Sequence, residues 1–207
     1  MISKRSLIRR GTAVAAAGTA ALVLAACGGG GAAGHNSHTG ASPSAAASAP
    51  ASQEQHHAAD IAFAQGMIPH HRQAVEMADL APSRAQSAEV QKLAADIKKA
   101  QDPEIKTLSG WLTAWGEEVP AEGADHSMHS GSGMMTAEDM EKLKNASGTV
   151  FDTAFMEMMI EHHEGAVAMA KTEQADGSYT PAKKMAGQII SSQTAEIQKM
   201  NELLGKS

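Results

Sequence analysis

The chain has 207 residues, which is enough for one ordinary domain with appendages. Three Phe, two Trp and one Tyr are too few aromatic residues for the strands of an all-β sandwich, so we expect an aliphatic core. The formal net charge is −6, and four of the 17 basic residues precede Cys27, so the rest of the chain is still more acidic, which argues against nucleic acid as a partner.

Residues 1–26 have the pattern of a lipoprotein signal peptide. A basic start is followed by an uncharged run from Gly11 to Ala26, which is shorter than the roughly 20 residues that span a bilayer. The run ends in Leu-Ala-Ala-Cys, similar to the lipobox at which bacterial lipoproteins are cleaved and acylated. We therefore expect an exported protein, lipid-anchored through Cys27 to the outside of a membrane, in the periplasm or at the cell surface.

Residues 27–55 are rich in Gly, Ala, Ser and Pro and have no apolar periodicity. Such a segment cannot bury enough surface to offset its ordering entropy, so it is predicted to be a flexible tether. It would hold the folded part, predicted as residues 56–207, away from the membrane.

An internal repeat with an offset of 92 residues is the strongest signal in the chain. The pattern Met-Ile-x-His-His-x-x-Ala-Val-x-Met-Ala occupies residues 67–78 and recurs at 159–170. The same offset relates Ala-x-x-Ile-x-x-x-Gln-x-x-Glu-Ile at 94–105 to its copy at 186–197. Two copies of one supersecondary unit are therefore expected to pack together.

Each repeated block has helical periodicity, which predicts an all-α fold. A heptad that starts at Phe63 places both His and both Met of the first copy on or beside one inward-facing stripe. We predict a four-helix bundle made of two αα-hairpins: repeat 1 at 58–117, a Met- and His-containing loop at 118–147, and repeat 2 at 148–207. Within the hairpins, Ala81-Pro82 and Asp176-Gly177 are predicted helix stops.

Two prolines distinguish the copies. Pro69 stands where the second copy has Glu161, and Pro103 where it has Ala195. Proline inside a helix removes a backbone donor and clashes with the preceding turn, so we expect the first half to be kinked or interrupted there.

The repeated His pairs and Met residues predict a metal site. Neighbouring residues on a helix point about 100° apart, so the two His of a pair must face different helices. Each Met taken singly is more often core filling, but four buried imidazoles without partners would be costly. Thioether and neutral imidazole favour Cu(I), and Ag(I) as its chemical relative. The predicted ligands are Met67, His70, His71, Met77, Met159, His162, His163 and Met169.

Polar residues on the second helix of each hairpin are candidates for supporting roles. Gln101, Glu104, Gln193 and Glu196 are expected to hydrogen-bond the imidazoles, although they could equally form interhelical contacts with no metal nearby. Asp60 and Asp152 are interpreted as helix N-caps in preference to outer metal ligands.

The loop between the halves carries a second group of soft ligands. A loop site is less preorganised than one on helices, so it would be an accessory or capture site. Its candidate residues are His126, Met128, His129, Met134 and Met135.

The duplicated Met-Ile-x-His-His and Gln-x-x-Glu-Ile blocks resemble those of exported bacterial proteins that carry domain of unknown function 305, among them copper-binding proteins of the CopM type. The resemblance covers about residues 60–204. It implies a ferritin-like helical bundle that binds copper or silver in the cell envelope and contributes to metal tolerance.

Two other functions remain as alternatives. A di-iron oxidase needs Glu-x-x-His pairs on two helices, whereas the one such pair here is Glu54 with His57, at the edge of the tether. A metal-free helical module could use its Met-rich faces as an adaptable docking surface for proteins. We expect a non-enzymatic protein that sequesters copper or passes it to a partner that the sequence does not identify.

Overall fold

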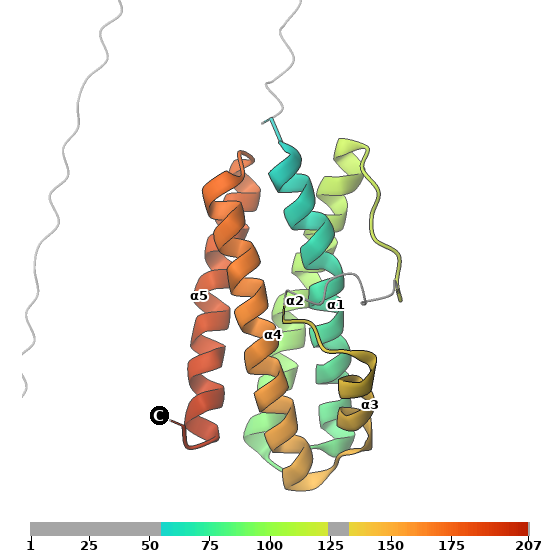
Figure 1. Cartoon of the computed structure of the whole chain (residues 1–207), viewed down its shortest axis with the longest axis vertical. Helices are drawn as coiled ribbons and strands as arrows, with labels where there is room; N and C mark the ends of the chain where they lie inside the picture. Colours follow the sequence, from blue (N-terminus) through green and yellow to red (C-terminus); the bar gives the residue numbers. More distant parts are fainter. Residues whose placement is uncertain (1–54, 124–132, 207) are drawn as a thin grey trace, which may run out of the picture. The chain divides into compact units, whose positions relative to one another are not determined.

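The computed structural model describes residues 55–123 and 133–206, which form five helices (Figure 1). Their bounds are Ala58–Arg84 (α1), Ala88–Trp115 (α2), Ala137–Asn145 (α3), Gly148–Asp176 (α4) and Thr180–Leu203 (α5). The predicted signal peptide, Cys27, most of the tether, and the loop residues His126, Met128 and His129 lie outside the described residues. No helix in the described ranges combines the length and apolar character that crossing a membrane requires.

The four long helices form two αα-hairpins, α1 with α2 and α4 with α5, which pack together through α1 and α4 (Figure 1). The two joining helices run in opposite directions. The expectation of an all-α bundle built from two repeated hairpins is therefore confirmed.

The prolines do not interrupt the helices. Pro69 and Pro82 both lie inside α1, which runs on to Arg84, and Pro103 lies inside α2. The expected interruptions, and the helix stop at Pro82, are therefore wrong. Pro69 is buried against the neighbouring helices, and such packing can outweigh the loss of one backbone hydrogen bond. Gly177, in contrast, does end α4 as its C-cap.

Helix α3 lies within the segment that the sequence analysis assigned to a loop. It begins with a capping box, in which the Thr136 side chain accepts from the Asp139 N–H and the Asp139 side chain accepts from the Thr136 N–H. Met140 and Leu143 are buried against the bundle. The short helix is stable because it adds this apolar face to an existing core, which local composition alone does not reveal.

The core consists of two hydrophobic clusters, one toward each end of the bundle. The Phe63 cluster contains the first half of α1, from Phe63 to Ile68, and the second half of α4, with Ala166 and Ala170. The Phe155 cluster contains the second half of α1 and the first half of α4, where Phe155 is the repeat equivalent of Phe63. Because α1 and α4 cross in opposite directions, each cluster combines the first half of one of these helices with the second half of the other.

Asp60 and Asp152 attach each hairpin to the turn of the other. Both oxygens of Asp152 accept backbone N–H groups of the α1–α2 turn, from Gln86 at 3.1 Å and Ser87 at 2.9 Å. Oδ1 of Asp60 accepts the N–H groups of Ser178 at 3.0 Å and Tyr179 at 2.8 Å in the α4–α5 turn. The N-caps of α1 and α4 are His57 and Ser147, so neither Asp is itself the N-cap residue. The cap interpretation is wrong for Asp152, whereas Asp60 does cap α1 as the N3 residue of a capping box, in which its Oδ2 accepts the His57 N–H at 2.6 Å.

One end of the bundle adds a second carboxyl group to this arrangement. Glu173 is only 1% exposed, and burial, followed by its interaction with Asp60, raises its pKa from 4.5 to about 8. Burial alone would also raise the pKa of Asp60, but hydrogen bonds from the His57 and Tyr179 backbone lower it to about 2. At neutral pH Asp60 is therefore ionised and Glu173 carries a proton.

This pair predicts a pH-dependent stability. Between pH 4.5 and about 8 the folded protein keeps a proton on Glu173 that the unfolded chain has released, so its contribution to stability is complete below pH 4.5 and is lost as the pH rises to about 8. Glu173→Gln keeps a neutral donor and should remove this loss. We expect the unfolding free energy of wild type to fall steadily relative to that of Glu173→Gln as the pH rises through this range. Urea unfolding of both proteins at several pH values would measure the difference. A difference that stays constant with pH would contradict the assignment, and Glu117→Gln at an exposed position is the control.

Candidate metal centre

A polar layer crosses the middle of the bundle, between the Phe63 and Phe155 clusters. Every long helix contributes two adjoining or near-adjoining polar residues to it, and the four His side chains are at most 1% exposed. The polar layer consists of His70 and His71 (α1), Gln101 and Glu104 (α2), His162 and His163 (α4), and Gln193 and Glu196 (α5).

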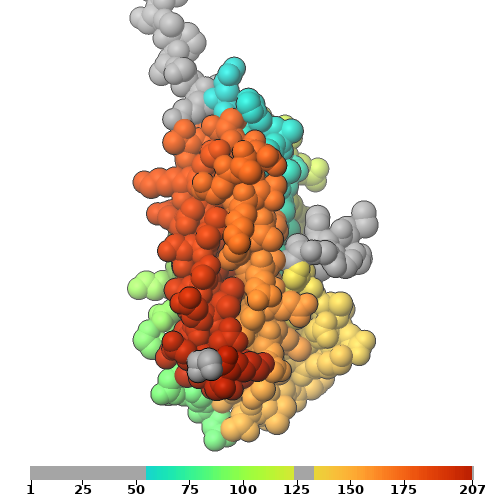
Figure 2. Space-filling model, turned by 60° about the vertical axis from the view of Figure 1, so that its left-hand side comes forward, coloured from blue at the N-terminus to red at the C-terminus, as the bar shows by residue number. Residues whose placement is uncertain are grey.

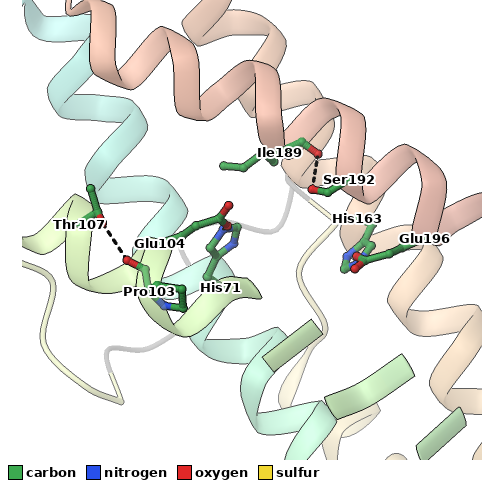
Figure 3. Close-up of polar contacts among 8 residues, drawn as sticks. All are labelled: His71, Pro103, Glu104, Thr107, His163, Ile189, Ser192 and Glu196. Atoms are coloured by element: carbon green, nitrogen blue, oxygen red, sulfur yellow. Dashed lines mark hydrogen bonds and ion pairs between the residues drawn. The ribbon is translucent and has the colours of Figure 1, made fainter. Parts of the chain in front are cut away.

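Two of the imidazoles are held by carboxylates of their own hairpin (Figure 3). Nε2 of His71 lies 2.8 Å from Glu104 Oε2, and Nε2 of His163 lies 2.7 Å from Glu196 Oε2. The Nδ1 atoms of His71 and His163 are buried and have no hydrogen-bond partner. The carboxylates therefore fix the orientation of both rings and leave one nitrogen of each inside the layer.

The other two imidazoles meet each other across the interface between the hairpins. The ring centroids of His70 and His162 are 3.8 Å apart, with the planes inclined at 45°. Neither ring nitrogen of His162 has a hydrogen-bond partner. Burial, and then the proximity of His70, lower the pKa of His162 well below 6.5, so this ring is neutral at pH 7 and has the lone pair that a metal ligand needs.

Methionine thioethers lie on both sides of the polar layer. Met67 of α1 belongs to the Phe63 cluster, and Met169 of α4 packs against that cluster, where its Cε lies 2.9 Å from the position of a Cβ added to Gly66. Met77 and Met159 both belong to the Phe155 cluster. Each cluster therefore contains one of these thioethers from each copy of the repeat.

The donor set is that of a soft cation. Across residues 55–123 and 133–206, no three His, Cys, Asp or Glu side chains are grouped so that they could hold a metal ion. The polar layer instead offers an imidazole pair with thioethers above and below it, and this combination suits Cu(I) or Ag(I) better than the oxygen-preferring ions. Gln101 and Gln193 lie in the layer with buried Oε1 atoms that have no partner.

The structure also shows polar contacts that the sequence analysis missed. The buried Gln73 side chain donates to the Met135 carbonyl at 2.8 Å and accepts the Met135 N–H at 2.7 Å. Arg72 donates to the carbonyls of Pro120 at 2.6 Å and Ala121 at 3.0 Å. Both ends of the connection between the halves are thus bound to α1, by the two residues that directly follow His71. The signal that could have revealed this is the repeat itself, which has Gly at position 165 where the first copy has Gln73.

Of the accessory ligands in this connection, two are described. Met135 is 5% exposed and belongs to the Phe155 cluster, and Met134 is half-buried beside it. Gly133 passes close to α4, since a Cβ on it would lie 2.4 Å from the Glu161 carbonyl oxygen. Met135 therefore serves as core in this structure.

The fold and the site define a class of protein: a duplicated helical bundle that has a layer of histidines where its two halves cross. The model of the family described as Domain of unknown function (DUF305) matches residues 60–204, so the chain belongs to this family, as its motifs led us to expect. Among curated proteins, none matches the chain.

Solved structures of DUF305 proteins share the fold. A candidate secreted DUF305 protein from Streptomyces coelicolor is 33% identical with a TM-score of 0.65, and the match covers 72% of this chain and 93% of that one. A DUF305 fragment from Deinococcus radiodurans is 27% identical with a TM-score of 0.66, over 73% and 99% of the two chains. CopM in its Cu(I)-bound form is 33% identical with a TM-score of 0.58, over 70% and 94%. CopM has also been solved with Cu(II) and with Ag.

The His–Glu contacts predict equal stability losses in the two halves. Glu104→Leu or Glu196→Leu would leave the Nε2 of a fully buried imidazole without its partner, which costs about 1–3 kcal/mol of unfolding free energy. We expect similar losses for the two variants in urea unfolding, because the contacts are 2.8 Å and 2.7 Å long. As a control, Glu202→Ala on the surface should cost less than about 0.5 kcal/mol. Losses as small as the control's would show that the carboxylates do not support the rings.

Proposed function

We propose that this protein binds Cu(I), and Ag(I) in its place, in the polar layer between the two hairpins. The observation that carries the proposal is the set of buried imidazole nitrogens without hydrogen-bond partners, on His71, His162 and His163. An unpartnered polar atom in a core costs about 1–3 kcal/mol, and a bound ion would remove that cost. We assign His70 and His162, which meet between the halves, as the central ligands.

The thioethers complete the proposed donor set. Met67 and Met169 lie on one side of the polar layer, and Met77 and Met159 lie on the other. Thioether sulfur binds Cu(I) and Ag(I) but is a poor ligand for Mg²⁺, Ca²⁺ or Mn²⁺. His71 and His163 would adjust the site from their carboxylate-fixed positions. Similarity to the CopM structures with Cu(I), Cu(II) and Ag bound, at 33%, 36% and 32% identity, supports this choice of metal.

The proposed task is sequestration or transfer of copper outside the cytoplasm. The proposal is limited to binding the metal and does not include catalysis. Anchoring is proposed from the lipobox-like sequence that ends at Cys27.

The metal assignment predicts that the central imidazoles control affinity. In a titration of the metal-free protein with Cu(I) against a competing chelator, wild type should bind more tightly than micromolar, and His70→Ala combined with His162→Ala should bind at least tenfold more weakly. Circular dichroism would verify that the variant still folds. His56→Ala is the matched control, since His56 stacks on Trp115 with ring centroids 4.5 Å apart and lies outside the layer. Unchanged titration curves in the double variant would make the central His structural.

The anchor predicts a membrane-bound protein when the full chain is expressed in a bacterial host. Wild type should incorporate radiolabelled fatty acid and sediment with membranes, whereas Cys27→Ser should do neither, because the thiol is the acylated group. Equal labelling of the two proteins would exclude Cys27 as the anchor.

A further inference from the structure

Within residues 55–123 and 133–206, the polar layer reaches solvent at Glu104 in one hairpin and at Glu196 in the other. Glu104 and Glu196 have side-chain exposures of 21% and 20%, whereas His71 and His163, which they hold, are fully buried. A cation that moves between solvent and the imidazoles has its shortest polar route past one of these carboxylates. We name them the first mouth, at Glu104, and the second mouth, at Glu196 (Figure 3).

The first mouth is partly covered by the segment that follows α2. Beside it lies a cavity of about 450 Å³ whose lining has two basic side chains, Arg72 and Lys106, and two acidic ones, Asp102 and Glu122. Arg72 also holds the segment after α2 in place through the carbonyls of Pro120 and Ala121. The formal charges of this lining therefore cancel, and the guanidinium of Arg72 with its bound segment opposes the approach of a metal ion from this side.

The second mouth has the same framework, but its charged side chains are acidic. The repeat keeps the apolar lining residues, with Val167 for Val75 and Ile197 for Ile105. It replaces the charged ones: Glu164 stands for Arg72, Thr194 for Asp102 and Gln198 for Lys106. Because the two His–Glu contacts span the same 33 residues at nearly equal distances, these replacements occupy matching places around the second mouth.

The second mouth also lacks the side-chain contact that holds a segment over the first. Glu164 and Glu161 are exposed on α4, and no hydrogen bond among the described residues ties a loop to Glu164 as Arg72 ties one, although Gly133 packs against the α4 backbone at Glu161 and Gly165. Figure 2 shows α4 and α5, which form this mouth, side by side on one face of the bundle. Two acidic side chains on a low-dielectric surface raise the local concentration of cations.

We propose that the metal enters and leaves the polar layer through the second mouth, between α4 and α5, with Glu164 as the residue that attracts it and Arg72 closing the equivalent route in the other half. The inference rests on the proposed function. It assigns different roles to two halves whose ligands are the same.

The test exchanges charges at equivalent positions. Full-length wild type, Glu164→Arg and Arg72→Glu are mixed with free Ag⁺ in chloride-free nitrate buffer, and association is followed by stopped-flow ultraviolet absorption at low and high ionic strength. Glu164→Arg changes the charge of the side chain by two units. If the approaching Ag⁺ passes at about 8 Å in water, this change corresponds to about a fivefold slower association at low salt. The effect should disappear near 1 M salt, where the Debye length is about 3 Å.

Three comparisons make the result decisive. Glu117→Arg changes the net charge by the same amount at an exposed position away from the polar layer, and it should leave the rate within about twofold. Equal slowing by Glu117→Arg and Glu164→Arg would overturn the inference, because it would reflect net charge alone. A fivefold acceleration in Arg72→Glu with no effect of Glu164→Arg would place the route at the first mouth. Absence of Ag⁺ binding at equilibrium in wild type would overturn the proposed function and the inference together.

Discussion

The contacts of two buried imidazoles, His71 and His163, with their glutamates are the interactions on which the rest of the polar layer depends. A bundle of this size would be more stable with an apolar middle, because each buried polar group left without a partner costs about 1–3 kcal/mol. The His71–Glu104 and His163–Glu196 contacts keep two of the rings satisfied at one nitrogen and orient them. The two hydrophobic clusters then supply the stability that the layer does not. Because the polar layer lowers the stability of the core, its presence indicates a role in function.

The meeting of His70 with His162 explains why the duplicated sequence suits a shared site. These residues are equivalent in the two copies, and two equivalent residues come into contact only near the axis that relates the copies. Residues away from that axis occur twice, as the His–Glu pairs and the two thioether pairs do. Donors from both halves therefore converge on the middle of the α1–α4 interface without any long loop to bring them there. Rigid helices hold such donors more accurately than loops do.

Much of this arrangement could be predicted from periodicity and the repeat. The stripe that begins at Phe63 indicated which residues of α1 are buried, and the 100° step between His70 and His71 predicted that they face different helices. The prolines could not be judged in this way, since whether a helix continues through Pro69 depends on packing from other helices. Glu173 was missed because the repeat has Ala81 in its place. Its raised pKa arises from burial first and then from Asp60, a neighbour 113 positions away.

The differences between the copies follow from a topological constraint. One chain that builds two equivalent hairpins needs a connection between them, and that connection must pack somewhere. Here it packs on α1, where Arg72 and Gln73 bind its two ends, while α4 has Glu164 and Gly165 at the same positions. The connection also passes close to α4 there, because a Cβ added to Gly133 would lie 3.2 Å from the Gly165 Cα. The connection is therefore hydrogen-bonded to side chains of α1 and approaches the backbone of α4, and two ligand sets that began as copies come to have unequal surroundings.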